Sequence, residues 1–168
     1  MTDNAEAETV APKWTPEDDP DGYTWDDLKN RDWVLEQFLS VTFGLDDETE
    51  NASVSLTVDF GGTIVSGVVI PRGAWLVRMA ELLNGAFSVD NGEGLGDALE
   101  RNWRRQFDEM TEERHARAEK GLPTVGRGYI HFGDATVYAN GAQMRVKQWR
   151  GIMSSVTGWS LGEMVRQD

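Results

Sequence analysis

The chain has 168 residues, which suits one domain with a tail, and its formal net charge is -13. Such an acidic chain is not expected to bind nucleic acid, because contact with a phosphate backbone depends on clustered Lys and Arg. It has no cysteine, which excludes disulfides and thiol chemistry. No apolar run reaches the roughly 20 residues of a membrane span, and the N-terminus lacks the features of a secretory signal. We therefore expect a soluble, cytoplasmic protein that does not bind membranes.

The first 22 residues form a polar, acidic segment that is interrupted by three prolines. A segment of this composition buries too little apolar surface to offset the entropy lost on ordering. The sequence therefore predicts a disordered acidic tail over residues 1–22 and a single α+β domain over residues 23–168. Trp14 in the tail and Tyr23 beside it could anchor the tail on the domain, or the tail lies loosely on its surface.

A helix is expected within residues 25–43, and it could be broken near Asn30. Its start is indicated by the capping-box pattern of Thr24 and Asp27, and apolar residues then recur at helical spacing. The acidic stretch 46–51 that follows could chelate calcium, but it lacks the ligand pattern of an EF-hand loop. A solvated loop is the favoured interpretation.

After the acidic stretch, apolar and polar residues alternate as in a strand with one buried face. Gly61 and Gly62 then separate two β-rich runs, which is a strong hairpin signal because both central residues of a type I′ turn need positive φ. The second run, residues 63–70, is apolar on both faces and is therefore expected in the centre of the sheet. Pro71 ends this run and opens a helix that should finish near residues 84–85.

The glycine-rich stretch 90–96 is expected to be a flexible connector, since no strand leads into it and no GK[ST] follows it, as a phosphate-binding loop requires. Apolar residues then fall on one face of a helix over residues 96–120. The end of this helix is polar all round and is expected to project into solvent. Its basic spot, Arg104 and Arg105 with Arg101 one turn away, could receive an acidic partner or the protein's own tail, or it is simply solvated.

The remainder of the chain is typical of a sheet, with glycine-containing turns between short β-rich runs. Together with the first hairpin it gives about six strands in three hairpin-like pairs, with two to three helices. The predicted class is α+β, with a mostly antiparallel sheet that is strongly bent or closes into a small barrel. The expected turns are Gly133–Asp134, Asn140–Gly141 and Thr157–Gly158, and the last two strands are expected over residues 143–156 and 159–165.

No catalytic constellation stands out in the sequence. His115 lies on the polar helix and His131 in a strand, and neither has further ligands at metal-binding spacing. A triad of Ser154 or Ser155 with His131 and Asp134 can be assembled on paper, but no nucleophile elbow supports it. We predict that the protein is not an enzyme and has no catalytic, cofactor-binding or metal site.

The run from Lys147 to Met164 is the most distinctive stretch, with two tryptophans and three glycines in two β-rich arms. A tryptophan brings a large apolar area that needs a partner surface, and a glycine inside a strand indicates a bend, a bulge or a close backbone approach. Trp149 and Trp159 are therefore either core residues or exposed anchors for a partner. The core interpretation is slightly favoured.

Four stretches occur in a fixed order: SVSLTVDFGGTIVSGVVI, an amphipathic helix with Trp75 and Leu76, YIHFGDATVY and WRGIMSSVTGWSLGEM. In this order they resemble the gas vesicle accessory protein U family (GvpU) over residues 53–164, with residues 85–126 unmatched in detail. In that family a V-x-G-x-x-[IV]-S-G hairpin also precedes a helix, and the chain closes with W-R-G-[KI]-I-x-x-V-x-G-[WF]-x-L-G. The closing motif is the most specific part of the resemblance.

The resemblance implies a non-enzymatic accessory protein, associated with gas vesicles, that promotes their clustering or assembly. Its implied partners are the vesicle shell or other gas vesicle proteins and further copies of itself. A polar C-terminal extension, which the family resemblance leads us to expect, does not follow the last strand, so the acidic N-terminal tail substitutes for it or clustering works otherwise. The matched positions with an expected contact role are Trp149, Arg150 and Trp159, and those expected to determine the fold are Gly62, Ser66, Gly67, Gly151, Ile152, Val156, Gly158, Leu161 and Gly162.

The charge alone suggests an alternative function. An acidic binding module, either an adaptor or an inhibitor that mimics nucleic acid, would use its carboxylates to hold a basic partner. Such binding would weaken steeply with salt. A simple gain in solubility explains the same charge.

Overall fold

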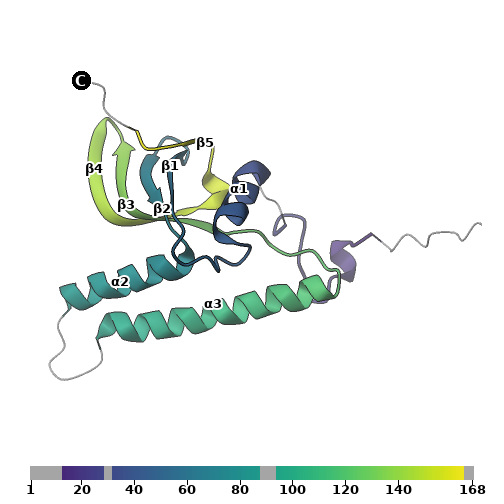
Figure 1. Cartoon of the computed structure of the whole chain (residues 1–168). Coiled ribbons are helices and arrows are strands. Elements are labelled where there is room, and N and C mark those ends of the chain that lie inside the picture. The colour runs from purple at the N-terminus through teal and green to yellow at the C-terminus, as the bar shows by residue number, and fades with distance from the viewer. Residues whose placement is uncertain (1–12, 29–31, 88–93, 165–168) are drawn as a thin grey trace, which may run out of the picture.

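The computed structural model describes residues 13–28, 32–87 and 94–164, which form an α+β domain with a short segment before it (Figure 1). The described residues contain three α-helices and one five-stranded antiparallel sheet. Three expected features lie outside the described residues: the break near Asn30, most of the connector, and the first half of the tail. The helices are α1 (Trp33–Phe43), α2 (Arg72–Ala86) and α3 (Leu95–Glu119), and the strands are β1 (Val54–Asp59), β2 (Ile64–Val69), β3 (Tyr129–Ala139), β4 (Ala142–Ile152) and β5 (Gly158–Leu161).

The strand order is β4-β3-β2-β1-β5, so β2 lies in the centre of the sheet, as its apolar sequence predicts. The hairpin of β1 and β2 is confirmed. Gly61 and Gly62 have φ of 68° and 103°, and the N–H of Phe60 donates to the carbonyl of Thr63 across the turn. The turn at Asn140 and Gly141, both with positive φ, is confirmed between β3 and β4.

The sheet has five strands and not six because the expected turn at Gly133 and Asp134 is a bulge within the continuous strand β3. Asp134 has a φ of 63°, and the register between β2 and β3 shifts beside it, at Gly67. A Cβ atom on Gly67 would lie 2.5 Å from the carbonyl oxygen of Asp134. A residue with positive φ, here Asp134, occurs in bulges as well as in turns, so the local sequence does not distinguish the two.

The expected terminal hairpin and the expected barrel are wrong. β4 and β5 form the two opposite edges of the sheet and do not pair, and the sheet is neither closed nor strongly curled. After β4, a short 3₁₀ turn (Met153–Ser155) carries the chain across the end of the sheet. The N–H of Thr157 then donates to the carbonyl of Asp59, so β5 adds to β1 and does not fold back on β4.

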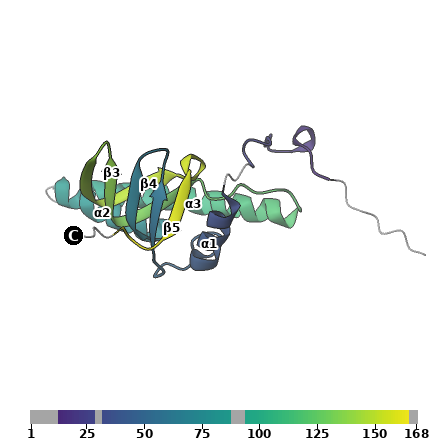
Figure 2. The same ribbon diagram turned by 90° about the horizontal axis from the view of Figure 1, so that it is seen from above.

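The core lies between one face of the sheet and α1, which contributes Leu35, Leu39 and Phe43, all essentially buried. Figures 1 and 2 show α1 beside the β5 end of the sheet, and in Figure 1 α2 and α3 lie side by side below the sheet, with α3 continuing beneath α1. α2 packs on β3 and β4, and α3 packs along α2. In the described residues, none of the helices is long and apolar enough to span a membrane.

Most side chains at the far end of α3 are exposed, as expected, but this end also contacts another segment of the chain through Arg117. Arg117, which is 5% exposed, forms ion pairs with Asp19 and Asp21, and its guanidinium lies 3.9 Å from the centre of the Tyr23 ring. The hydrogen bonds that Arg117 donates to Asp19 hold the pKa of this carboxyl group well below its usual range. The second half of the expected tail and Tyr23 beside it therefore contact the domain at Arg117. The basic spot on α3 does not hold the tail in this way, since Arg104 pairs with Glu100 on its own helix.

Gly67→Ala tests the close approach of β2 to the bulge. We expect this change to lower the free energy of unfolding by about 2 kcal/mol, because backbone atoms of β3 occupy the space that the new Cβ needs. Gly85→Ala in α2, where nothing lies within 4 Å, is the matched control and should raise stability by up to about 1 kcal/mol. Urea unfolding followed by circular dichroism measures both. Equal effects from the two changes would contradict the close approach.

Candidate functional site

A cavity of about 370 Å³ lies between α3 and the end of the sheet. It exists because α3 packs along α2, and α2, not α3, packs on the sheet. The loop after α1, the start of α2 and the connection from α3 to β3 form its rim. Its volume lies within the range of natural ligand sites, roughly 300–1,000 Å³.

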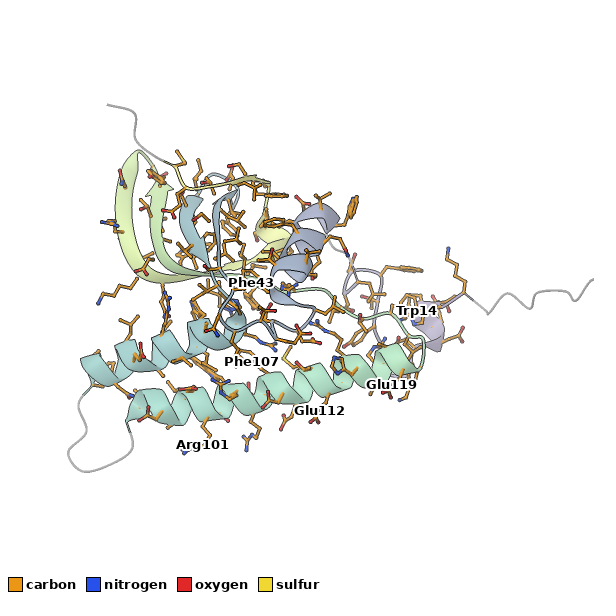
Figure 3. The ribbon with its side chains drawn as sticks, in the orientation of Figure 1. Trp14, Phe43, Arg101, Phe107, Glu112 and Glu119 are labelled. Carbon is orange, nitrogen blue, oxygen red and sulfur yellow. The ribbon has the colours of Figure 1, made fainter. Side chains whose placement is uncertain are left out.

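One wall of the cavity is the apolar face of α3 that the sequence predicts. Trp103, Phe107 and Met110 line the cavity from this helix. In Figure 3, Phe107 points from α3 toward the sheet, while Arg101 and Glu112 point away from it. None of the three wall residues is fully buried, so this apolar face meets a cavity.

The cavity is lined by four arginines, and two of them are paired with the acidic loop after α1. Arg114 lies 2.9 Å from Asp46, and Arg127 lies 2.7 Å from Asp47. Arg127 also binds Glu36 and the carbonyl of the residue that caps α1. The loop carboxylates therefore serve as partners for cations, and the described residues contain no cluster of three or more potential metal ligands.

The other two arginines of the cavity have no carboxylate partner among the described residues. Arg72 donates to the hydroxyl of Thr111 at 3.3 Å, and its guanidinium lies 4.4 Å from the centre of the Phe107 ring. Partial burial lowers its pKa. The guanidinium of Arg150 lies 3.4 Å from the centre of the Tyr129 ring. Two positive charges therefore line the same cavity, and in the described ranges neither forms an ion pair, although Asp46 and Asp47 act on Arg72 electrostatically.

His131 and Trp75 lie at the inner end of the cavity, with ring centres 5.1 Å apart. Both are more than nine-tenths buried, and neither His131 Nε2 nor Trp75 Nε1 has a hydrogen-bond partner within the described ranges. Burial, with a smaller contribution from Arg150, lowers the pKa of His131 to about 4, so its ring is neutral at pH 7. Because Nε2 has no partner, the triad drawn from the sequence with Ser154 or Ser155 does not form.

Of the three expected contact residues, only Arg150 reaches the cavity. Trp149 is half-buried, with its ring centre 4.6 Å from that of Phe60 and 5.9 Å from that of Phe132. Trp159 stacks on Phe38 at 5.7 Å, and its indole N–H donates to Asp32, the N-cap of α1, at 2.8 Å. Both tryptophans therefore attach neighbouring elements to the core.

The positions that the sequence analysis expects to determine the fold lie in different environments. Ser66 is buried and its hydroxyl accepts from the N–H of Met164 at 2.6 Å. Gly67 and Gly151 have no room for a side chain, since the Trp149 ring fills the space beside Gly151. The remaining positions are Gly62 and Gly162 with positive φ, Gly158 at the start of β5, Val156 in the core, and Ile152 and Leu161 with exposed side chains.

The sequence did not single out a second surface, the outer face of α1. Trp33 is 69% exposed and Val41 is 87% exposed, with Val34 exposed between them. A signal was present, because the helix has large apolar residues on two faces and only one face can meet the core. An exposed apolar face of this kind is typical of an interaction site. We refer to Trp33, Val34 and Val41 as the α1 patch.

A family model described as "Gas vesicle protein GvpU-like" matches residues 32–164. No curated protein and no solved structure matches the chain. The matched range begins at the N-cap of α1 and ends after β5, so it includes the sheet, the cavity and the α1 patch, but not the segment that Arg117 holds.

Arg127→Ala should lower the free energy of unfolding by about 3 kcal/mol, because it leaves the largely buried carboxylates of Glu36 and Asp47 without their shared cation. Arg127→Lys should recover part of this loss, since one ammonium cannot replace a guanidinium that binds several oxygens. Arg105→Ala, which removes an exposed pair with Glu109, is the control and should cost less than about 0.5 kcal/mol. Chemical unfolding compares the three variants; a loss for Arg127→Ala as small as the control would contradict this role.

His131 should make the protein less stable as the pH falls. Its pKa is lowered to about 4 in the folded protein from 6.5, so the unfolded chain takes up a proton that the folded protein does not. The contribution of the neutral ring is complete above pH 6.5 and is lost between pH 6.5 and pH 4. Urea unfolding measures the free energy of unfolding at pH 7.5 and at pH 5. Between these two pH values, the wild type should lose about 2 kcal/mol more of this free energy than His131→Phe. Parallel pH profiles of the two proteins would contradict the burial of a neutral ring.

Proposed function

The chain belongs to the GvpU-like family of gas vesicle proteins, and from this membership we propose a non-enzymatic accessory role: it promotes the clustering or assembly of gas vesicles. It does so by contacting the vesicle shell and by associating with further copies of itself. The single observation that carries the proposal is the family match over residues 32–164, which includes every helix and strand of the domain.

The α1 patch is the surface that we assign to shell contact. Its side chains are exposed although their helix is firmly held: the opposite face of α1 is buried in the core, and Asp32 at its start accepts a hydrogen bond from Trp159. A rigid apolar surface loses little conformational entropy on binding. Trp159 contributes in this proposal by fixing α1 in place, and a partner would bury the apolar area of the patch.

The open edges of the sheet support self-association. β4 is an edge strand of eleven residues whose first four residues are all exposed, and β5 presents the exposed side chain of Leu161 at the other edge. Unpaired backbone groups of an edge strand can pair with a strand of another chain. Trp149 supports β4 from the core side, and Arg150, which is exposed near the opposite end of the strand, remains a candidate contact residue.

The double change Trp33→Ser and Val41→Ser tests shell contact. Purified gas vesicles float on centrifugation, and bound protein floats with them. At equal concentration, we expect the amount of double variant that floats with the vesicles to be at least tenfold lower than for the wild type. The two serines bury much less apolar area on binding than Trp33 and Val41 do. Val77→Ser on α2, which is exposed but outside the α1 patch, should float like the wild type. Equal flotation of wild type and double variant would refute this assignment.

A further inference from the structure

We propose that the cavity between α3 and the sheet binds an acidic peptide segment of a partner protein, in which a carboxylate lies next to an aromatic side chain. The inference rests on the proposed function in one respect, because the ligand is taken to be part of a protein with which this chain assembles. It assigns a role to the one expected contact residue that reaches the cavity, Arg150.

The charge of the cavity selects an anion. Arg72 and Arg150 both line it without a carboxylate partner among the described residues, whereas Arg114 and Arg127 are neutralised by the acidic loop. In a chain of net charge -13, a local excess of positive charge is the exception. Guanidinium groups bind carboxylates through two parallel hydrogen bonds, and these charge-assisted bonds are stronger than neutral ones.

The walls select an apolar neighbour for that anion. Trp103, Phe107 and Met110 face the cavity from α3, and Tyr129 faces it from β3. A small inorganic anion would leave the space between these apolar side chains unfilled, while an aromatic ring would fill it. The indole N–H of Trp75 at the inner end is a buried donor without an acceptor in the described part of the chain, and a peptide oxygen can supply one.

The chain itself binds a segment of this chemistry at the next site along α3. Arg117 pairs with Asp19 and Asp21 and stacks on Tyr23. The small hollow beside Tyr23 shares Arg72, Met110 and Arg114 with the cavity, so the two sites adjoin. The acidic–aromatic segment of the chain therefore lies at one end of a continuous surface, and the cavity offers the same kind of contacts at the other end.

The probe for the test is the fluorescein-labelled peptide Asp-Pro-Asp-Gly-Tyr, which repeats the sequence held by Arg117. Its fluorescence anisotropy is titrated with the full chain in the absence of vesicles. We expect saturable binding that Arg72→Gln and Arg150→Gln each weaken at least tenfold, since each removes a charge-assisted contact. Arg145→Gln, on the same strand as Arg150 but outside the cavity, should leave the Kd unchanged. The same peptide with Asn in place of Asp should not bind.

Three outcomes would overturn the proposal. The first is no binding of the peptide at millimolar protein. The second is an unchanged Kd for Arg72→Gln and Arg150→Gln, which would mean that the peptide only displaces residues 19–23 from Arg117. The third is displacement of the peptide by inorganic phosphate as effectively as by unlabelled peptide, which would indicate a simple anion site.

A second readout keeps the test independent of folding defects. The indole ¹⁵N–¹H resonance of Trp75, assigned by its loss in Trp75→Phe, should shift when the peptide binds to the wild type and stay in place with the Asn peptide. Thermal melting confirms that the arginine variants are folded. Because no vesicle takes part, failure of peptide binding would leave the flotation result standing, and failure of flotation would leave the peptide site standing.

Discussion

Arg127 holds together the part of the molecule on which the site depends. Its guanidinium is nearly buried and binds Glu36 on α1, the carbonyl of Gly44 at the end of α1, and Asp47 in the acidic loop. The residue itself lies just before β3. One side chain thus fixes a helix, a loop and the entry to a strand at a single point. A buried cation of this kind is tolerated only because several oxygens replace the water that it loses.

The cavity follows from that arrangement and from the position of α3. Arg127 and Asp47 keep the acidic loop on the rim, and α2 keeps α3 away from the sheet. The loop carboxylates form ion pairs with Arg114 and Arg127, so the other two arginines of the cavity have no ion-pair partner among the described residues. The overall acidity of the chain therefore says little about this site. Local pairing decides which sign of charge a ligand meets, and here the sign is opposite to that of the whole protein.

Local patterns were sufficient to predict much of the fold. The Gly61–Gly62 hairpin, the central place of β2 and the apolar face of α3 depend on periodicity and turn chemistry, which a single sequence contains. The position of β5 could not be predicted in this way, because its partner β1 is roughly 100 residues earlier in the chain. The bulge at Asp134 was missed because its local signal is that of a turn.

For the site, the sequence indicated single residues but not their combination. Arg150 was singled out from a motif, yet the role that we propose for it depends on which carboxylates the other arginines bind. These pairings connect residues far apart in sequence. Trp75 was predicted as part of an apolar stripe, and nothing local indicated that its indole N–H would lack an acceptor. The family match added the biological setting and covers the residues of the cavity, but it assigns no role to any of them.

The place of β5 also bears on how the chain folds as it leaves the ribosome. Strands β1 to β4 can pair in the order in which they are made, since each neighbours the next. The outer edge of β1, however, stays uncovered until residues 158–161 have been synthesised, and α1 lacks its contact with Trp159 until the same moment. A growing chain therefore exposes an unpaired strand edge beside an apolar helix for most of its synthesis. Such an intermediate is prone to pair with neighbouring chains on the same message through the free edge of β1, an edge that β5 covers in the folded protein.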